Sequence, residues 1–241
     1  MQLQDFYSTD GELVTFTRTQ ASEFAKNVAD DFNPLHDPDA KLFCVPGDLL
    51  FAVALSSYGL SKHMRFIFTG MVDGGVPLVF PPSDDPKISI IDNENKTYLQ
   101  LERDGEISHD ASVIKTLICN YVEFSGHAFP HILVPLMAEH NIMINPKRPL
   151  VIYESMEIHL DQLNLTSPTL EYTGATLELN GKKGNISLNF LLKEGEMIVG
   201  RGAKYMLARG LQPYQKDVVD EVVKGYSELK QLYRARQTST T

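Results

Sequence analysis

Only two cysteines, Cys44 and Cys119, occur in the 241 residues of this chain. Two thiols cannot form a disulfide framework, and low cysteine content is typical of proteins in reducing compartments. The first twelve residues also lack the basic and apolar regions of a secretory signal peptide. These absences predict reduced thiols and a cytoplasmic location.

Long apolar runs and an excess of basic residues are missing as well. The longest apolar run, Leu49 to Leu55, falls short of the roughly 20 residues that a helix needs to cross a bilayer. Lysine and arginine total 22 against 31 acidic residues, which gives a net charge of −9. Surfaces that bind nucleic acids or anionic membranes are basic. We therefore expect no nucleic-acid partner and no membrane association.

No group of side chains has the spacing of a metal site or a phosphate-binding loop. The two cysteines are isolated from each other and from histidines. Gly70 to Gly75 (GMVDGG) lacks the Lys-Ser/Thr pair of a nucleotide-binding loop and the spacing of a dinucleotide turn. We expect neither a metal ion nor a redox cofactor.

Hydrophobic periodicity divides the N-terminal part of the chain into distinct elements. Residues 11–18 alternate apolar and polar side chains, which predicts a strand, and residues 19–29 fit a helix capped by Thr19 or Ser22. Residues 30–46 are rich in Asp, Asn and Pro, which favours a loop. Residues 47–60 begin with a segment that is apolar almost all round, which is typical of a helix enclosed on every side.

A similar order recurs later in the chain. Strand-like segments follow the enclosed helix, and residues 111–125 fit a helix or a strand, with a helix favoured. Residues 129–138 form a second short apolar segment before long alternating runs, so we expect this segment to be the buried helix of a second copy. An antiparallel sheet wrapped around an enclosed helix is the hot-dog fold. We predict an α+β tandem, or double, hot-dog.

The expected boundaries follow from the repeat. They are residues 1–105 for an N-terminal repeat that carries the candidate site, 106–211 for a C-terminal repeat, and 212–241 for a helix and a tail that is disordered from Gln237.

One short motif contains the most informative chemistry. Asp31-Phe32-Asn33-Pro34-Leu35-His36 places a carboxylate and an imidazole on either side of an Asn-Pro turn. Such a turn can aim both groups at one water molecule, an arrangement suited to adding water to an activated double bond. The alternative is an ordinary Asx turn at Asp31 with His36 exposed to solvent.

Residues 11–56 resemble the N-terminal part of the MaoC-like, or R-specific, enoyl-CoA hydratases, which carry an Asp-x-Asn-Pro-x-His motif after a strand and a short helix. The resemblance implies that Asp31 and His36 are the catalytic pair and that Asn33 supports them through its side-chain amide. It implies a trans-2-enoyl thioester of coenzyme A or acyl carrier protein as the substrate.

The head of the enclosed helix departs from the family pattern. The family has His-Gly-Met where this chain has Pro46-Gly47-Asp48, so the resemblance implies that the Gly47 backbone N–H donates to the thioester oxyanion. Asp48 would oppose that negative charge if it pointed inward, and would favour the helix if it pointed at its own N-terminus. Gly47 also fits an ordinary helix-start glycine. The second repeat lacks the motif, so we expect one site per chain.

Three functions remain open at this stage. The first is a hydratase or dehydratase, a lyase that uses Asp31 and His36. The second is a thioesterase in which Asp48 activates water. The third is a non-catalytic protein that binds an acyl thioester or lipid. The terminal helix could also join two chains in a homodimer.

Overall fold

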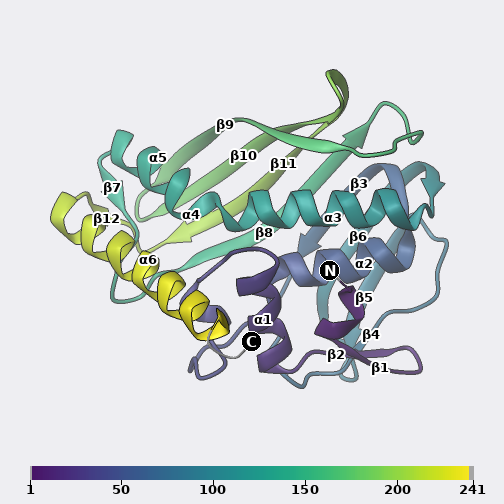
Figure 1. Ribbon diagram of the computed structural model, residues 1–241, viewed down its shortest axis with the longest axis horizontal. Helices are drawn as coiled ribbons and strands as arrows, with labels where there is room; N and C mark the ends of the chain where they lie inside the picture. The colour runs from purple at the N-terminus through teal and green to yellow at the C-terminus, as the bar shows by residue number, and fades with distance from the viewer. Residues whose placement is uncertain (1, 239–241) are drawn as a thin grey trace.

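Within residues 2–238, which the computed structural model describes, ten strands form one antiparallel sheet (Figure 1). In spatial order they are β1 (Ser8–Asp10), β2 (Leu13–Thr15), β4 (Leu78–Val79), β5 (Lys87–Asp92), β6 (Thr97–Ser108), β3 (Leu60–Phe68), β8 (Val151–Leu160), β11 (Met197–Arg209), β10 (Lys183–Glu194) and β9 (Thr169–Asn180).

The sheet consists of two halves with the same internal order. From its centre outward, one half runs β3-β6-β5-β4 and the other β8-β11-β10-β9. The halves meet where β3 pairs with β8, in a register from His63↔His159 to Ile67↔Ser155. This order confirms the predicted double hot-dog, in which each half follows a helix that covers the same face of the sheet.

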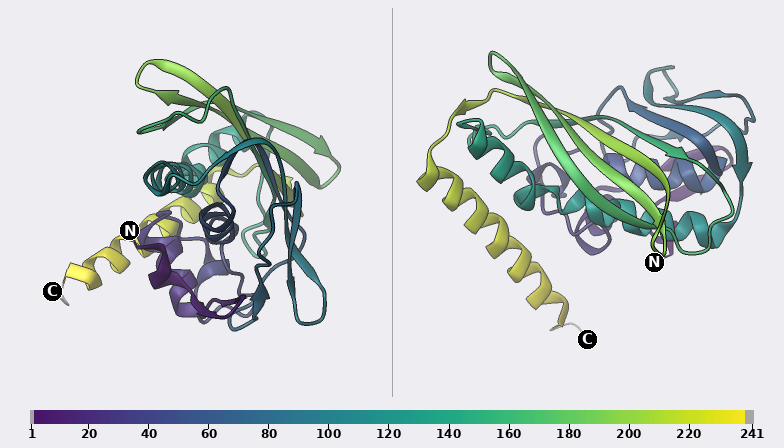
Figure 2. Two further views of the ribbon diagram at one scale, coloured as in Figure 1. Left: turned by 90° about the vertical axis from the view of Figure 1, so that its right-hand side faces the viewer. Right: turned by 90° about the horizontal axis from the view of Figure 1, so that it is seen from above.

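Two helices lie side by side on the inner face of the curved sheet (Figure 2). In α2 (Gly47–Tyr58) every side chain from Asp48 to Leu55 is buried, as expected for a helix that is apolar all round. In α3 (Ala111–Gly126) burial repeats at helical spacing, as at Val113, Leu117 and Tyr121, so this helix has one buried face and one exposed face. α2 is therefore enclosed by the sheet, by α3 and by the N-terminal segment.

The prediction that residues 129–138 form the second central helix was wrong. That segment forms two short helices, α4 (Ala128–His131) and α5 (Leu133–Glu139), beyond the end of α3. Pro130 disfavours a helical backbone at Phe129, which has φ −105° and ψ 130°, and Pro130 itself has no N–H to donate. The helix beside α2 is α3, which residues 111–125 predict.

The first helix also begins earlier than predicted. α1 spans Arg18–Asn27, and Thr17 caps it by accepting from the Gln20 N–H while the Gln20 side chain accepts from the Thr17 N–H. This capping box satisfies two donors at the helix start. It ends the preceding strand β2 at Thr15, so the strand predicted over residues 11–18 is confirmed only over Leu13–Thr15, and the predicted caps Thr19 and Ser22 were wrong.

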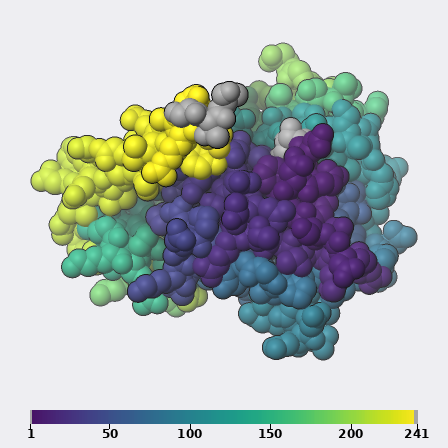
Figure 3. Space-filling model, turned by 60° about the horizontal axis from the view of Figure 1, so that its bottom comes forward, coloured from purple at the N-terminus to yellow at the C-terminus, as the bar shows by residue number. Residues whose placement is uncertain are grey.

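The C-terminal helix α6 (Lys216–Thr238) crosses the molecule and lies against the N-terminal segment (Figure 3). None of its residues is buried, but Tyr226 and Tyr233 pack edge-on against the ring of Phe32. Gln237 and Thr238 belong to this helix, contrary to the predicted disorder, and residues 239–241 lie outside the described part. No helix within residues 2–238 is both long enough and apolar enough to cross a membrane.

The remaining short elements connect these layers. They are the 3₁₀ helices η1 (Leu3–Phe6) and η2 (Pro34–His36) and the paired strands β7 (Ile142–Met143) and β12 (Gln212–Pro213).

A close backbone contact fixes α3 against the segment that leads to the Asp31 motif. A Cβ atom added to Gly126, the last residue of α3, would lie 1.7 Å from the backbone oxygen of Ala29. Because that oxygen belongs to the main chain, the clash cannot be relieved by rotating a side chain. The contact therefore allows only glycine at position 126.

We expect Gly126→Ala to destabilise the fold by about 1–3 kcal/mol or more, because the added methyl group overpacks a backbone contact. Thermal unfolding measures this as a lower Tm. Gly225→Ala is the matched control, since a Cβ at Gly225 in α6 meets no atom within 4 Å. The control should be neutral or stabilising by up to about 1 kcal/mol. Equal Tm values for the two variants would contradict the tight contact.

Candidate functional site

The turn that holds Asp31 and His36 is built by its own backbone and by Asn33. The Asn33 side-chain oxygen accepts from the Leu35 N–H at 3.1 Å and caps η2, in which Pro34 is the first residue. The His36 N–H then donates to the Asn33 backbone oxygen at 2.9 Å. This tight turn brings the His36 Nε2 atom to 3.6 Å from the Asp31 Oδ2 atom.

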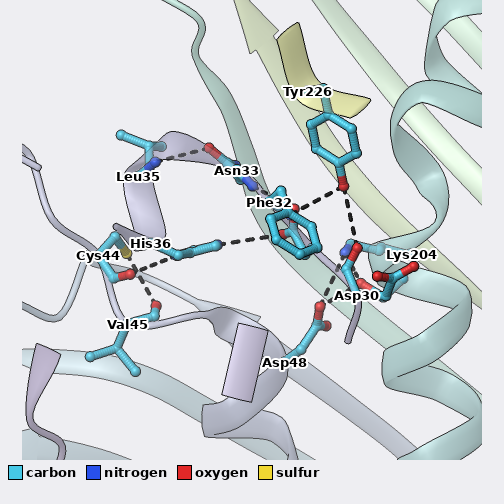
Figure 4. A network of polar contacts seen from close by, with 12 residues as sticks. Asp30, Phe32, Asn33, Leu35, His36, Cys44, Val45, Asp48, Lys204 and Tyr226 are labelled. Carbon is cyan, nitrogen blue, oxygen red and sulfur yellow. Dashed lines mark hydrogen bonds and ion pairs between the residues drawn. The ribbon is translucent and has the colours of Figure 1, made fainter. Parts of the chain in front are cut away.

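The His36 ring is fixed from its other side (Figure 4). Its Nδ1 atom lies 2.7 Å from the backbone oxygen of Cys44. A carbonyl oxygen only accepts, so Nδ1 carries a hydrogen and Nε2 remains available for proton transfer. The Cys44 N–H also donates to the Leu35 backbone oxygen at 2.9 Å, which holds the two segments together.

The neighbouring thiol is not an alternative nucleophile. Burial raises the pKa of Cys44 to about 11, while a backbone contact at Val72 lowers it and the charge of Asp73 raises it further. A thiol needs to be deprotonated to attack. At neutral pH Cys44 therefore serves the site through its backbone oxygen.

Asp31 sits in an environment that favours its protonated form. Burial raises the pKa of Asp31, and the His36 charge and the Asn33 N–H, which donates to Asp31 Oδ1 at 2.9 Å, partly offset this. Asp31 therefore does make the Asx-type contact of the alternative interpretation. His36, however, has a side chain only 12% exposed and faces Asp31, so it is not a solvated histidine.

Asn33 orients the pair through its side chain and its backbone. Its side-chain oxygen caps η2, and its backbone N–H contacts Asp31. The side-chain amide therefore holds the turn that carries His36, and the backbone N–H holds Asp31.

Gly47 is the first residue of α2. The first hydrogen bonds of the helix run from the N–H groups of Leu49 and Leu50 to the Pro46 oxygen. The N–H groups of Gly47 and Asp48 precede them and have no acceptor within the helix. A Cβ at Gly47 would lie 2.8 Å from Cδ1 of Tyr153 in β8. Glycine is thus required here by the approach of a ring from the other half of the sheet.

Asp48 follows neither of the two orientations considered from the sequence. It is only 7% exposed, and its Oδ2 atom accepts from the Ser125 hydroxyl at 2.6 Å and lies 3.8 Å from the Lys204 Nζ atom. Lys204 also donates to the Ser125 Oγ atom. The second oxygen, Oδ1, is buried and has no hydrogen-bond partner among residues 2–238. Asp48 therefore points at the C-terminal half of the fold.

The C-terminal half contributes a buried polar cluster that the sequence analysis missed. We define the cross-half cluster as Asp48 of α2, Tyr121 and Ser125 of α3, Tyr153 of β8 and Lys204 of β11. The two tyrosine hydroxyls contact each other, and Lys204 Nζ lies 4.0 Å from the centre of the Tyr153 ring. Burial first, and then the charge of Asp48, raise the pKa of Tyr121, and burial likewise raises that of Tyr153.

One signal in the sequence points to this cluster. The alternation of β11 places Lys204 on the same side of the strand as Gly202 and Met206, both of which are buried. A lysine at such a position requires a buried partner.

Helix α6 covers the segment that precedes the pair. The Tyr226 hydroxyl accepts from the Phe32 N–H at 3.1 Å and donates to the Asp30 backbone oxygen at 3.3 Å. Burial, followed by the charge of Asp31, raises the pKa of Tyr226.

The side chain of Asp30 adds a polar clamp to this cover. It accepts from Lys230, from Arg234 at 3.0 Å and from His127 at 3.1 Å. Burial raises the pKa of Asp30, but its contacts with Lys230, His127 and Arg234 outweigh burial and lower the pKa below its usual range. The ends of α3 and α6 therefore both anchor the residue next to Asp31.

Two recesses lie elsewhere on the molecule. One of about 370 Å³ opens on the outer face of the sheet, where His63 and His159 meet between β3 and β8. The other is an apolar crevice of about 30 Å³ between α5, β7 and α6. Asp31 and His36 line neither of them.

Several solved structures are similar to this chain at low identity. Acyl-CoA thioesterase II TesB2 from Mycobacterium marinum is 9% identical, with 89% of this chain and 100% of that chain covered and a TM-score of 0.46. A hot-dog protein from Alicyclobacillus acidocaldarius is 8% identical, with 87% and 98% covered and a TM-score of 0.47. A MaoC-like dehydratase is 9% identical, with 86% and 99% covered and a TM-score of 0.42. Identities this low transfer no activity to this chain.

Sequence comparison places the chain in one family. No curated protein sequence matches it. The model of the family described as "Protein of unknown function (DUF3581)" matches residues 1–217, up to the start of α6. Since this match covers most of the chain, the protein belongs to the DUF3581 family.

Proposed function

We propose that this protein adds water reversibly to a trans-2-enoyl thioester, carried by coenzyme A or acyl carrier protein, and forms a 3-hydroxyacyl thioester. The observation that supports this proposal most directly is the convergence of the Asp31 carboxylate and the His36 Nε2 atom, 3.6 Å apart. That separation is too long for a hydrogen bond between the two atoms, and a water molecule can contact both of them.

In the proposed reaction, the Asp31–His36 pair removes a proton from the bound water while its oxygen attacks the β-carbon. The pair then delivers a proton to the α-carbon, so that it ends the cycle with the protons it began with. Hydrogen bonds from Asn33 N–H to Asp31 and from His36 Nδ1 to Cys44 hold both groups in place during these transfers.

The thioester oxygen gains negative charge as the double bond is attacked. The N-terminus of α2, with the Gly47 amide at its head, supplies a fixed partial positive charge beside the pair. The nearby Asp48 carboxylate would weaken this stabilisation if it were alone. Lys204, 3.8 Å from Asp48, offsets that charge, so the departure from the family's His-Gly-Met sequence is compatible with the reaction.

Substrate access in this proposal depends on movement next to the pair. Tyr226 and the polar contacts of Asp30 hold α6 over residues 30–32, and no residue of α6 is fully buried. Covers held by a few surface contacts open readily during a catalytic cycle.

We expect the purified protein to hydrate crotonyl-CoA or a longer enoyl-CoA, measured as the loss of absorbance of the conjugated thioester. Asp31→Asn and His36→Ala should each lower kcat/KM by on the order of a hundredfold or more, because each removes one half of the proton-transfer pair.

His63→Ala is the control, since His63 lies on the outer face of the sheet. It should retain the activity of the unaltered protein. Full activity in folded Asp31→Asn and His36→Ala proteins would rule out the proposed roles.

A second function is favoured by one specific observation. The Asp48 Oδ1 atom is buried at the head of α2, with no hydrogen-bond partner in the residues that the structure describes, and it could hold a water molecule there for attack on a thioester carbonyl. This would make the protein an acyl-thioester hydrolase.

If the protein is a thioesterase, Asp48→Asn should abolish release of free thiol from acyl-CoA, and His36→Ala should leave that release largely intact. The hydratase proposal predicts instead that no free thiol is released by any of these proteins, and that His36→Ala loses the hydration of enoyl-CoA. Thermal stabilisation by acyl-CoA with turnover in neither assay would identify a binding protein instead.

A further inference from the structure

The cross-half cluster contains a buried pair of opposite charges, Asp48 and Lys204, which stability alone does not readily explain. Asp48 and Lys204 are 7% and 6% exposed, and their nearest charged atoms are 3.8 Å apart with Ser125 between them. A buried ion pair gives little net stability, because the loss of hydration offsets most of its attraction. The pair is also incompletely satisfied, since no hydrogen bond reaches Asp48 Oδ1 from the described part of the chain.

The position of the pair suggests a different role. The Asp48 carboxylate and the Lys204 amine lie next to Phe32, the neighbour of Asp31 in the chain (Figure 4). After burial, the His36 charge and the Asn33 N–H, the Asp48 charge raises the pKa of Asp31 and the Lys204 charge lowers it. Lys204 comes from β11 in the C-terminal half, whereas Asp31 and Asp48 belong to the N-terminal half. The N-terminal half alone would therefore present Asp31 with an unbalanced negative charge.

We propose that the C-terminal half contributes to the proposed reaction, because Lys204, held against Asp48 by Ser125, offsets the Asp48 charge near Asp31 and so helps to set the pH at which Asp31 exchanges its proton. Lys204 and Ser125 are positioning residues, since they act on the reaction through Asp31 and Asp48. This inference deepens the proposed hydratase function and rests on it for its kinetic readout.

Other charged and titratable groups surround Asp31 besides Lys204. Those that face Asp31 are His36 of η2, Asp48 of α2 and Tyr226 of α6. The neighbouring Asp30 is held by Lys230 and Arg234 of α6 and by His127 after α3. Because these contacts are the same in the variants below, changes at Lys204 or Asp48 act on a constant background.

The test is the pH profile of kcat/KM for enoyl-CoA hydration in two single variants with opposite charge changes. Lys204→Met removes a cation near Asp31, so Asp31 takes up a proton more readily and the acidic limb should move to higher pH. Asp48→Asn removes an anion, so the acidic limb should move to lower pH. Each shift should be on the order of one pH unit.

A double variant and a surface control separate this role from a structural one. Each single variant leaves one buried charge unpaired and should lower the Tm. The double variant, Lys204→Met with Asp48→Asn, removes both charges, so its acidic limb and its Tm should return close to those of the unaltered protein. Lys87→Met is the matched control, because Lys87 pairs with Glu102 on the outer face of the sheet, and its profile should not change. If folded single variants keep the original profile, the proposal is wrong.

A readout without substrate keeps this inference separate from the proposed function. The carboxyl carbon of Asp31 in ¹³C-aspartate-labelled protein, assigned with Asp31→Asn, should titrate at higher pH in Lys204→Met and lower pH in Asp48→Asn. These opposite shifts are expected even if no thioester is turned over, in which case only the hydratase proposal fails. If Lys204→Met does not fold, Asp48→Asn, which keeps the contact to Ser125, decides alone: an unchanged Asp31 titration overturns the proposal.

Discussion

The enclosure of α2 is the constraint on which the rest of the structure depends. Every residue from Asp48 to Leu55 is buried, so one layer of sheet cannot cover this helix and the second half must close over it. α3 packs along α2, and β8 extends the sheet from β3. The pairing of the two halves is therefore a requirement for burying α2, and it brings residues of β8, β11 and α3 to the head of that helix.

The same enclosure concentrates polar chemistry at one end of α2. Residues 49–55 of the helix offer no polar side chain, whereas its first turn carries Asp48, which lies near the segment of Phe32 and His36 (Figure 4). A carboxylate buried there needs compensation, which in this fold comes from Lys204 and Ser125 of the other half. The candidate site is thus assembled at the junction of the two halves, although its motif is local in sequence.

The features that were predictable from the sequence are those encoded over short distances. Asp31 and His36 meet because an Asn-Pro turn lies between them, and α2 is evident from an uninterrupted apolar segment. The second central helix was misplaced because apolar content alone favoured residues 129–138, whereas the amphipathic spacing of residues 111–126 decided the outcome. Ser125 and Lys204 lie 77 and 79 residues from their partners Asp48 and Ser125, and no local pattern specifies such contacts.

Stability alone does not explain the buried ion pair, and this bears on function. Well-packed apolar residues of similar volume commonly replace a buried pair without loss of stability, whereas removing a single partner is strongly destabilising. A fold that needed only to close over α2 could use an apolar residue at both positions 48 and 204. Asp48 and Lys204 instead carry opposite charges, and both charges act on Asp31. In the proposed reaction, a buried pair of opposite charges near Asp31 can shift the protonation of that carboxyl group while the carboxyl group stays shielded from water. A solvent-exposed pair such as Lys87–Glu102 cannot do this, because water screens its charges.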